Sequence, residues 1–164
     1  MANLWLLARK ARTLPLWLYC VAAGLVAFLG SVVVLGAAWG TVAALGLDID
    51  LGSDNGRVTW ADAFGMLVLA PVVETLLLIG LLKLLNRVGL SDRSACITSA
   101  FLWGLAHGFL HPMRFFGSVW SFVIFGASYL SWRGDFPRSG FMAAAGPHLV
   151  VNSMALGLLH IGGA

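Results

Sequence analysis

The sequence predicts an all-α helical bundle that crosses a membrane about five times, and composition and hydropathy are the observations that predict it. Of its 164 residues, 60% are apolar and only 10% are charged, whereas a soluble domain averages about 25% charged residues. A soluble fold of this size has too little volume for its surface to bury so many apolar side chains. The composition therefore excludes a soluble globular domain and a disordered chain, and it favours one integral-membrane domain over residues 1–164.

Five apolar stretches are each long enough to cross the bilayer as a helix, which takes about 20 residues. These stretches are Leu14–Leu47, Ala63–Leu82, Ser94–Met113, Phe115–Trp132 and Ser139–Ala164. The first has more residues than one crossing needs, so we expect it to tilt or to extend beyond the bilayer. A loop rich in Asp, Gly and Ser separates the first two stretches, and short basic loops follow the second and the fourth.

The distribution of lysine and arginine predicts the orientation of the helices. With five crossings, the N-terminus, the second loop and the fourth loop share one side of the membrane. Eight of the ten basic residues lie on that side: Arg9, Lys10, Arg12, Lys83, Arg87, Arg93, Arg133 and Arg138. Because short loops rich in Lys and Arg stay on the inner side, we expect a cytoplasmic N-terminus. The small size and compact loops favour a bacterial plasma membrane, and the scattered basic residues do not favour nucleic-acid binding.

Three ionisable side chains fall in the central layer of the predicted bundle, where such groups are costly and usually functional. At a helical rise of about 1.5 Å per residue, Glu74 lies about 13 Å from the inner edge at Lys83. The same rise places His107 about 20 Å along its helix and His148 about 14 Å along the last helix. We therefore expect these three side chains to meet. Asn152 follows His148 by four residues and shares its helix face.

Prolines and small residues favour close contact around these groups. Pro71 precedes Glu74 by three residues and Pro147 directly precedes His148, and each proline loosens the local hydrogen-bond ladder. The helix of His107 also has a stripe of small residues at four-residue spacing, which are Ala100, Gly104 and Gly108. Such a stripe lets a neighbouring helix approach closely.

These side chains are sufficient for peptide hydrolysis. A carboxylate held among helices can act as a general base toward water, and a histidine opposite can position the water or protonate the leaving amine. A second histidine and an asparagine amide can donate hydrogen bonds to an oxyanion. One Glu and two His would also fill three positions around a catalytic zinc ion, with water in the fourth. The residues alone leave both possibilities open, a reaction without a cofactor and a zinc site of Glu74, His107 and His148.

Three short motifs resemble those of the CAAX prenyl protease type 2 family, also called the CPBP family. The motifs are Ala70-Pro71-Val72-Val73-Glu74, Trp103-Gly104-Leu105-Ala106-His107 and His148-Leu149-Val150-Val151-Asn152. They occur in the family's order, each on a separate predicted helix. The resemblance implies a glutamic-type intramembrane protease in which Glu74 is the base and His107 assists with the water. It assigns His148 and Asn152 to stabilisation of the oxyanion.

The first motif departs from the family pattern. Members usually have a Glu-Glu pair with an arginine four residues after the second Glu, and here Thr75 and Ile79 occupy those two positions. The aromatic residue of the second motif is Trp103 rather than the usual phenylalanine. The missing pair weakens a prediction of prenyl-protein processing, but all four residues assigned to the chemistry are present.

We therefore expect an intramembrane endopeptidase whose catalytic core covers about residues 63–160. The expected partners are the lipid bilayer and a membrane protein or lipidated peptide, cut in its C-terminal segment or elsewhere. No cofactor is expected, with zinc as the alternative. Two other classes compete: a non-catalytic binding protein and a small proton-coupled transporter with Glu74 and His107 as its relay. The transporter is less favoured because no inverted repeat is evident and His148 and Asn152 would have no role.

Overall fold

The computed structural model of the chain describes residues 13–47, 59–134 and 137–162, in which helices are joined by short turns and no strand occurs. The helices are α2 (Leu16–Ala44), α3 (Trp60–Phe64), the π-helical turn η2 (Gly65–Leu69), α4 (Ala70–Arg87), α5 (Asp92–Leu110), α6 (Arg114–Trp132) and α7 (Pro137–Gly162). The elements α3, η2 and α4 follow one another without a break and form one continuous helix. The all-α membrane bundle is confirmed, and each predicted stretch corresponds to one long helix. The basic residues Arg9, Lys10 and Arg12 and the acidic loop at 48–58 lie outside the described residues.

Within the described residues, four segments are long and apolar enough to cross a membrane, which indicates an integral membrane protein. They are Leu16–Ala44, Trp60–Arg87, Arg114–Trp132 and Arg138–Leu159. Helix α5 is also 19 residues long, but it begins with Asp92 and Arg93 and is not apolar enough to belong to this group. Its place in the bundle comes instead from its packing against α6, to which it is joined by a turn at 111–113.

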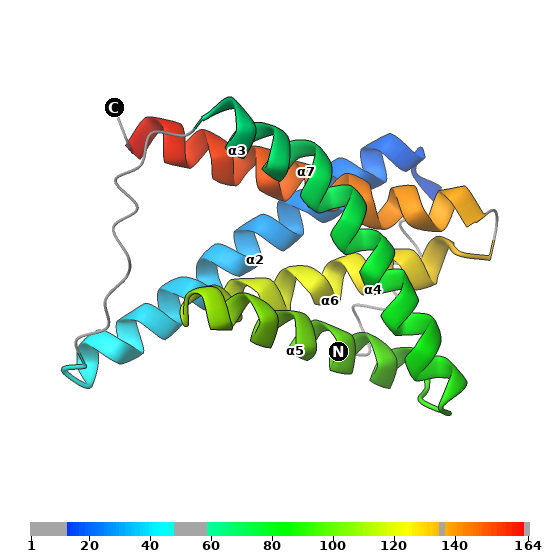
Figure 1. Cartoon of the computed structure of the whole chain (residues 1–164), viewed down its shortest axis with the longest axis horizontal. Coiled ribbons are helices and arrows are strands. Elements are labelled where there is room, and N and C mark those ends of the chain that lie inside the picture. The colour runs from blue at the N-terminus through cyan, green and yellow to red at the C-terminus, as the bar shows by residue number, and fades with distance from the viewer. Residues whose placement is uncertain (1–12, 48–58, 135–136, 163–164) are drawn as a thin grey trace.

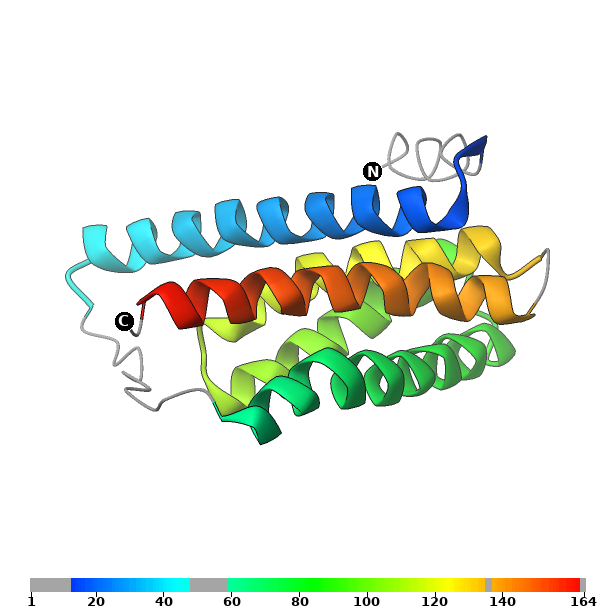
Figure 2. The same cartoon turned by 90° about the horizontal axis from the view of Figure 1, so that it is seen from above.

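Helix α6 is the central helix of the bundle. Nearly all residues from Ser121 to Trp132 are buried, because α2, α5 and α7 pack around this helix. Figure 1 shows the helices with their labels, and Figure 2 shows α2 along one edge of the bundle and α4 along the other, with α7 between them. Helix α4 contacts α5 and α7, so residues on one side of α4 face both of these helices.

Apolar side chains fill the space between α4, α5 and α6. Leu78 and Leu82 of α4, Cys96 of α5 and Phe122 and Phe125 of α6 are all buried in this core. Many large apolar side chains remain exposed on the outer helix faces, above all along α2. A continuous exposed apolar surface is expected where a protein faces lipid.

The stripe of small residues on α5 packs against α6, as the sequence predicts. Ala100 and Gly104 are buried. A Cβ atom on Gly104 would collide with the side chain of Val119 and press on Phe115, so only glycine permits this approach. Close contact of two helices through small residues is a common packing mode in membranes. This contact fixes the position of α5, on which His107 lies one turn before the helix end.

Candidate active site

Glu74 lies on the second turn of α4, just after a break in the regular α-helical hydrogen bonding. Ala70 donates its backbone N–H to the carbonyl of Gly65, five residues earlier, which makes this turn π-helical. Pro71 follows, and its ring nitrogen has no hydrogen to donate. The expected loosening of the helix at Pro71 is therefore confirmed as a π-helical turn. Turns of this kind occur often at functional sites.

Glu74, His107 and His148 converge from three different helices. The Oε2 atom of Glu74 lies 3.8 Å from Nε2 of His107 and 3.8 Å from Nε2 of His148. Both distances are too long for a direct hydrogen bond. The same Oε2 atom is buried and has no hydrogen-bond partner among the described residues. Buried polar atoms in proteins nearly always have a partner, so an unpartnered carboxylate oxygen here is a site that can accept a hydrogen bond from water or substrate.

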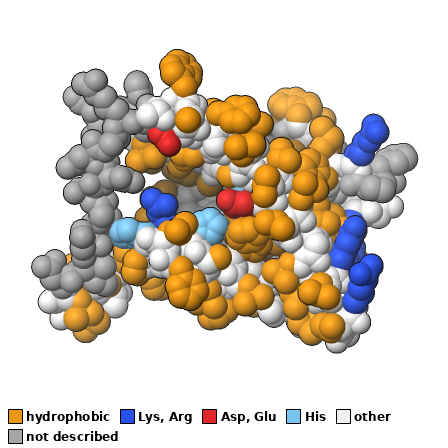
Figure 3. All heavy atoms as spheres, viewed as in Figure 1, with side chains coloured by type: hydrophobic (Ala, Val, Ile, Leu, Met, Phe, Trp, Pro, Cys, Tyr) orange, Lys and Arg blue, Asp and Glu red, His pale blue; other side chains and the backbone are white. Residues whose placement is uncertain are grey.

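The site is accessible from one face of the bundle. Side-chain exposure is 24% for Glu74 and 26% for His107, but only 6% for His148. Figure 3 shows an acidic side chain beside a histidine side chain at the edge of a hollow, within a largely hydrophobic surface. A substrate could therefore approach Glu74 and His107 from this face, while His148 forms the inner wall.

The hydrogen bond of His107 determines which of its ring nitrogens faces Glu74 with a lone pair. Its Nδ1 atom lies 2.9 Å from the carbonyl oxygen of Trp103, one turn earlier on α5. A carbonyl only accepts hydrogen bonds, so Nδ1 must be the protonated nitrogen. In the neutral ring Nε2 then has a lone pair directed toward Glu74. One water molecule could donate its two O–H groups to Nε2 of His107 and Oε2 of Glu74.

Aromatic side chains of α6 hold both histidines in place. Phe122 packs on His107 and His148, with ring centroids 5.6 and 5.8 Å apart, and stacks on Trp103 at 4.7 Å. Phe125 stacks almost parallel to His148 at 4.7 Å, with an angle of 21° between the rings. These two phenylalanines were not among the predicted site residues, because aromatic residues are common in membrane helices and nothing in their spacing sets them apart.

Asn152 lies one turn beyond His148 on α7, but the structure shows it bonded to the backbone rather than to Glu74. Its Nδ2 atom donates to the carbonyl oxygen of Met66 at 2.7 Å. Met66 belongs to the π-helical turn before Glu74. The four-residue spacing predicts the position of Asn152 relative to His148, but no sequence signal marks the carbonyl of Met66 as free.

The described residues do not form a metal-ligand set. Within them, no group of three His, Cys, Asp or Glu side chains is arranged to hold a metal ion. Of the other two histidines, only His111 has a described side chain, and no contact of it with Glu74 is among the ion pairs around this carboxylate. His111 ends α5, where its Nε2 is buried without a hydrogen-bond partner among the described residues, and the side chain of His160 is outside the described part of the chain.

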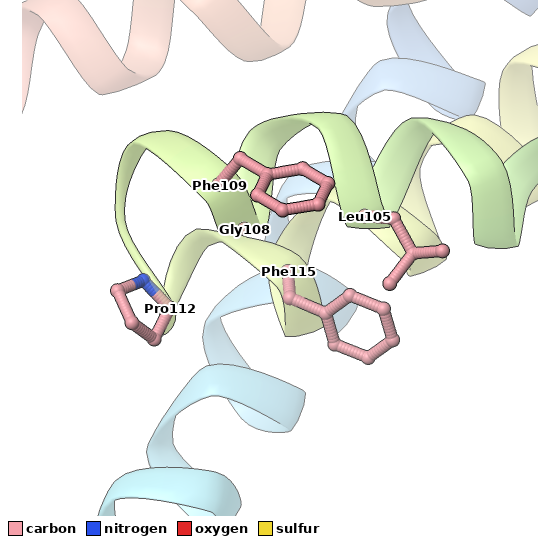
Figure 4. A pocket seen from close by; sticks show the side chains of 5 residues that line it. All are labelled: Leu105, Gly108, Phe109, Pro112 and Phe115. Carbon is pink, nitrogen blue, oxygen red and sulfur yellow. The ribbon is translucent and has the colours of Figure 1, made fainter.

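A second, apolar hollow of about 260 Å³ opens at the junction of α5 and α6. Figure 4 shows the residues that line it, which are Leu105, Gly108, Phe109, Pro112 and Phe115. None of the four expected site residues lines this hollow, although Gly108 directly follows His107 in the chain. None of its lining residues has a polar side chain, so it offers contact to an apolar chain and no catalytic group.

Comparison with known proteins supports the family that the motifs suggest. Residues 56–154, more than half of the chain, match the family described as type II CAAX prenyl endopeptidase Rce1-like. No curated protein and no solved structure matches the chain. The matched segment contains all of Glu74, His107, His148 and Asn152. The chain therefore belongs to the type II CAAX prenyl endopeptidase Rce1-like family, a family of proteases that act on membrane-associated substrates.

Proposed function

We propose that this member of the family is an intramembrane endopeptidase that uses Glu74 to activate a water molecule. The observation that supports the proposal best is the convergence of Glu74, His107 and His148 around one unpartnered carboxylate oxygen. An ionisable group at bilayer depth is costly, and here the described residues supply no hydrogen bond to that oxygen to offset the cost. Such an arrangement favours a reactive role over a structural one.

In the proposed reaction, water donates a hydrogen bond to Nε2 of His107 and transfers its other proton to Oε2 of Glu74. The water oxygen bonds to the carbonyl carbon of the scissile peptide, and the carbonyl oxygen becomes an oxyanion. An N–H of His148 stabilises that charge, an effect that is typically worth about 10²–10³-fold in rate. The C–N bond then breaks, and the proton held by Glu74 passes to the leaving amine.

The proposed substrate is a membrane protein or a lipidated peptide. The site opens on a face whose surroundings are apolar, and an apolar hollow lies close to His107 in the chain. A substrate with a lipid or a transmembrane segment can rest against such surfaces while its peptide bond reaches Glu74. Cleavage near the substrate's C-terminal segment is part of the proposal, although Thr75 and Ile79 replace the Glu and Arg of the usual first motif.

The test is a cleavage assay with the full chain reconstituted in liposomes. The probes are a quenched fluorescent farnesylated peptide with a C-terminal CAAX sequence and a panel of single-span membrane proteins. We expect the wild-type protein to cleave at least one probe and Glu74→Gln to lose about 10²–10⁴-fold in kcat, because the amide cannot accept the proton. Mass spectrometry of the products identifies the bond that is cut.

Two further measurements distinguish the competing functions. Metal analysis of the purified active protein, with and without chelator, separates a zinc enzyme from a metal-free one: stoichiometric zinc and activity lost on chelation would overturn the metal-free mechanism. Wild-type cleavage by Glu74→Gln would overturn the role of Glu74. Proton uptake by the liposomes without any cleavage would identify a transporter, and the absence of both activities would identify a non-catalytic protein.

A further inference from the structure

The carbonyl oxygen of Met66 has lost its usual partner within the helix. In an α-helix this oxygen would accept the N–H of Ala70, but Ala70 donates instead to Gly65. In a π-helical turn the donor would be the N–H of residue 71, and Pro71 has none. The oxygen is instead bonded by Nδ2 of Asn152 on α7, at 2.7 Å. A side chain from another helix thus replaces the missing backbone donor.

We propose that Asn152 is a positioning residue that holds this π-helical turn and thereby aims Glu74 at the two histidines. Its effect on catalysis rests on the proposed function of Glu74. By occupying the Met66 carbonyl, the amide of Asn152 leaves the N–H of Ala70 free to bond with Gly65, and this bond defines the π-helical turn. Without Asn152, the N–H of Ala70 would return to Met66 and the turn would revert to an α-helix.

The π-helical turn matters because it sets the rotation of α4. A π-helical turn contains one residue more than an α-helical turn, and successive residues of an α-helix are about 100° apart around its axis. Removing the turn would therefore rotate Glu74 by about 100° relative to α3, away from the side on which α7 lies. Among the contacts between this continuous helix and α7 are two polar ones, Asn152 with Met66 and His148 with Glu74. They occur in opposite order along the two antiparallel helices (Figure 2), so they contact α7 at two points two turns apart on this continuous helix.

This role differs from the oxyanion role that the family resemblance implies for Asn152. A positioning role depends on the Met66 carbonyl and hence on the absence of an N–H at residue 71. A direct role depends only on the distance between the amide and the substrate. Restoring an N–H at residue 71 therefore affects the first role and leaves the second unchanged, which makes Pro71→Ala the informative second substitution.

The experiment is a double-mutant cycle of Asn152→Ala and Pro71→Ala on the full chain in liposomes. Asn152→Asp is included because a carboxylate of nearly the same shape cannot donate to the carbonyl. Ser153→Ala is the matched control, since Ser153 neighbours Asn152 but is exposed, and its hydroxyl donates to the carbonyl of Leu149 within α7. Each variant is measured for kcat and KM, for melting temperature in detergent, and for hydrogen exchange of the segment 65–74.

We expect Asn152→Ala and Asn152→Asp each to lower kcat about 100-fold with little change in KM, because the base is misplaced rather than the substrate lost. Both should change the pattern of hydrogen exchange in the segment 65–74, because the N–H of Ala70 would change its acceptor from Gly65 to Met66. In the Pro71→Ala background the same Asn152→Ala change should have a much smaller effect on kcat and on exchange, since the N–H restored at residue 71 then bonds to the carbonyl of Met66. Ser153→Ala should behave as wild type.

Equal losses of kcat from Asn152→Ala in both backgrounds, with exchange in the segment 65–74 unchanged, would overturn the positioning role and support direct contact with the oxyanion. Wild-type kcat and exchange in Asn152→Ala would overturn it as well. The exchange and melting data need no substrate. If the wild-type protein cleaves no probe, the proposed function fails while these data still support or reject the bond between Asn152 and Met66.

Discussion

Two clusters of polar side chains in this bundle differ in how their charges are matched. At the end of the bundle that holds the turns after α4 and α6, Arg133 donates two hydrogen bonds of 2.9 Å to the two oxygens of Asp92. Asn86 donates a third to Asp92, at 2.6 Å. Around Glu74 no contact to a histidine is shorter than 3.8 Å, although Glu74 is less exposed than Asp92. The carboxylate that needs partners more has fewer of them.

The difference separates a structural cluster from a reactive one. The exposed carboxylate of Asp92 accepts both hydrogen bonds from one nitrogen of Arg133, so it joins the start of α5 to the end of α6 and contributes modestly to stability. A carboxylate within the bilayer without a protein donor lowers stability unless water or substrate binds to it. Glu74 combines a position at bilayer depth with a carboxylate oxygen that has no hydrogen-bond partner among the described residues. Either property alone would not separate it from residues with a structural role.

Of three substitutions that test this difference between the clusters, His107→Asn is expected to have the largest effect, which is a loss of kcat. The shorter amide keeps a donor near the position of Nδ1, so the bond to the Trp103 carbonyl is retained while the lone pair of Nε2 is lost. We expect kcat to fall about 100-fold or more and the melting temperature to stay near that of wild type. Steady-state cleavage and a melting curve measure the two effects. Wild-type kcat would show that the nitrogen facing Glu74 takes no part in the reaction.

A smaller effect is expected from Phe125→Leu, which removes the ring stacked on His148. Phe125 is 1% exposed, so the change also leaves a small cavity and should lower stability by about 1–2 kcal/mol. We expect kcat to fall more than KM changes, because His148 loses its fixed orientation. Phe116→Leu is the control, since Phe116 is 39% exposed and touches neither histidine in a ring contact. Equal kcat losses in both variants would remove the special role of Phe125.

The smallest effect is expected from Asp92→Asn in the structural cluster. The change removes the charge that Arg133 contacts but keeps the shape of the side chain. Because both side chains are more than a third exposed, we expect a loss of only about 0.2–1 kcal/mol in stability and no loss of kcat. Denaturation in detergent and the cleavage assay measure both. A kcat loss as large as that of His107→Asn would mean that the cluster around Asp92 also contributes to catalysis and is not purely structural.

Helix spacing and depth were enough to predict that Glu74, His107 and His148 lie close together. Each lies on a different apolar stretch at a similar depth. Because contact with lipid is unfavourable for an ionisable side chain, such side chains face the interior of the bundle and pair with one another. The five helices followed from hydropathy in the same way. Helix α5 could be predicted although it is less apolar than the other long helices. Its Asp and Arg residues are confined to its first two positions, and an apolar stretch follows them.

The partner of Asn152 and the aromatic wall of α6 could not be predicted. The bond to Met66 joins α7 to the π-helical turn at 65–69, and hydropathy encodes neither the turn nor the contact between these helices. By composition Phe122 and Phe125 could equally well face lipid. The packing of α6 against its neighbouring helices turns them inward. Local sequence determines which groups are available, and helix packing determines which of them meet.

In the proposed mechanism Glu74 activates water and does not attack the peptide itself. A single-turnover cleavage in water enriched in oxygen-18, followed by mass spectrometry of the product and of the protein, tests this claim directly. We expect one oxygen-18 atom in the new C-terminal carboxylate of the product and none in the peptide that contains Glu74. Label in Glu74, with unlabelled product in the first turnover, would show a covalent intermediate at this carboxylate and would contradict the mechanism.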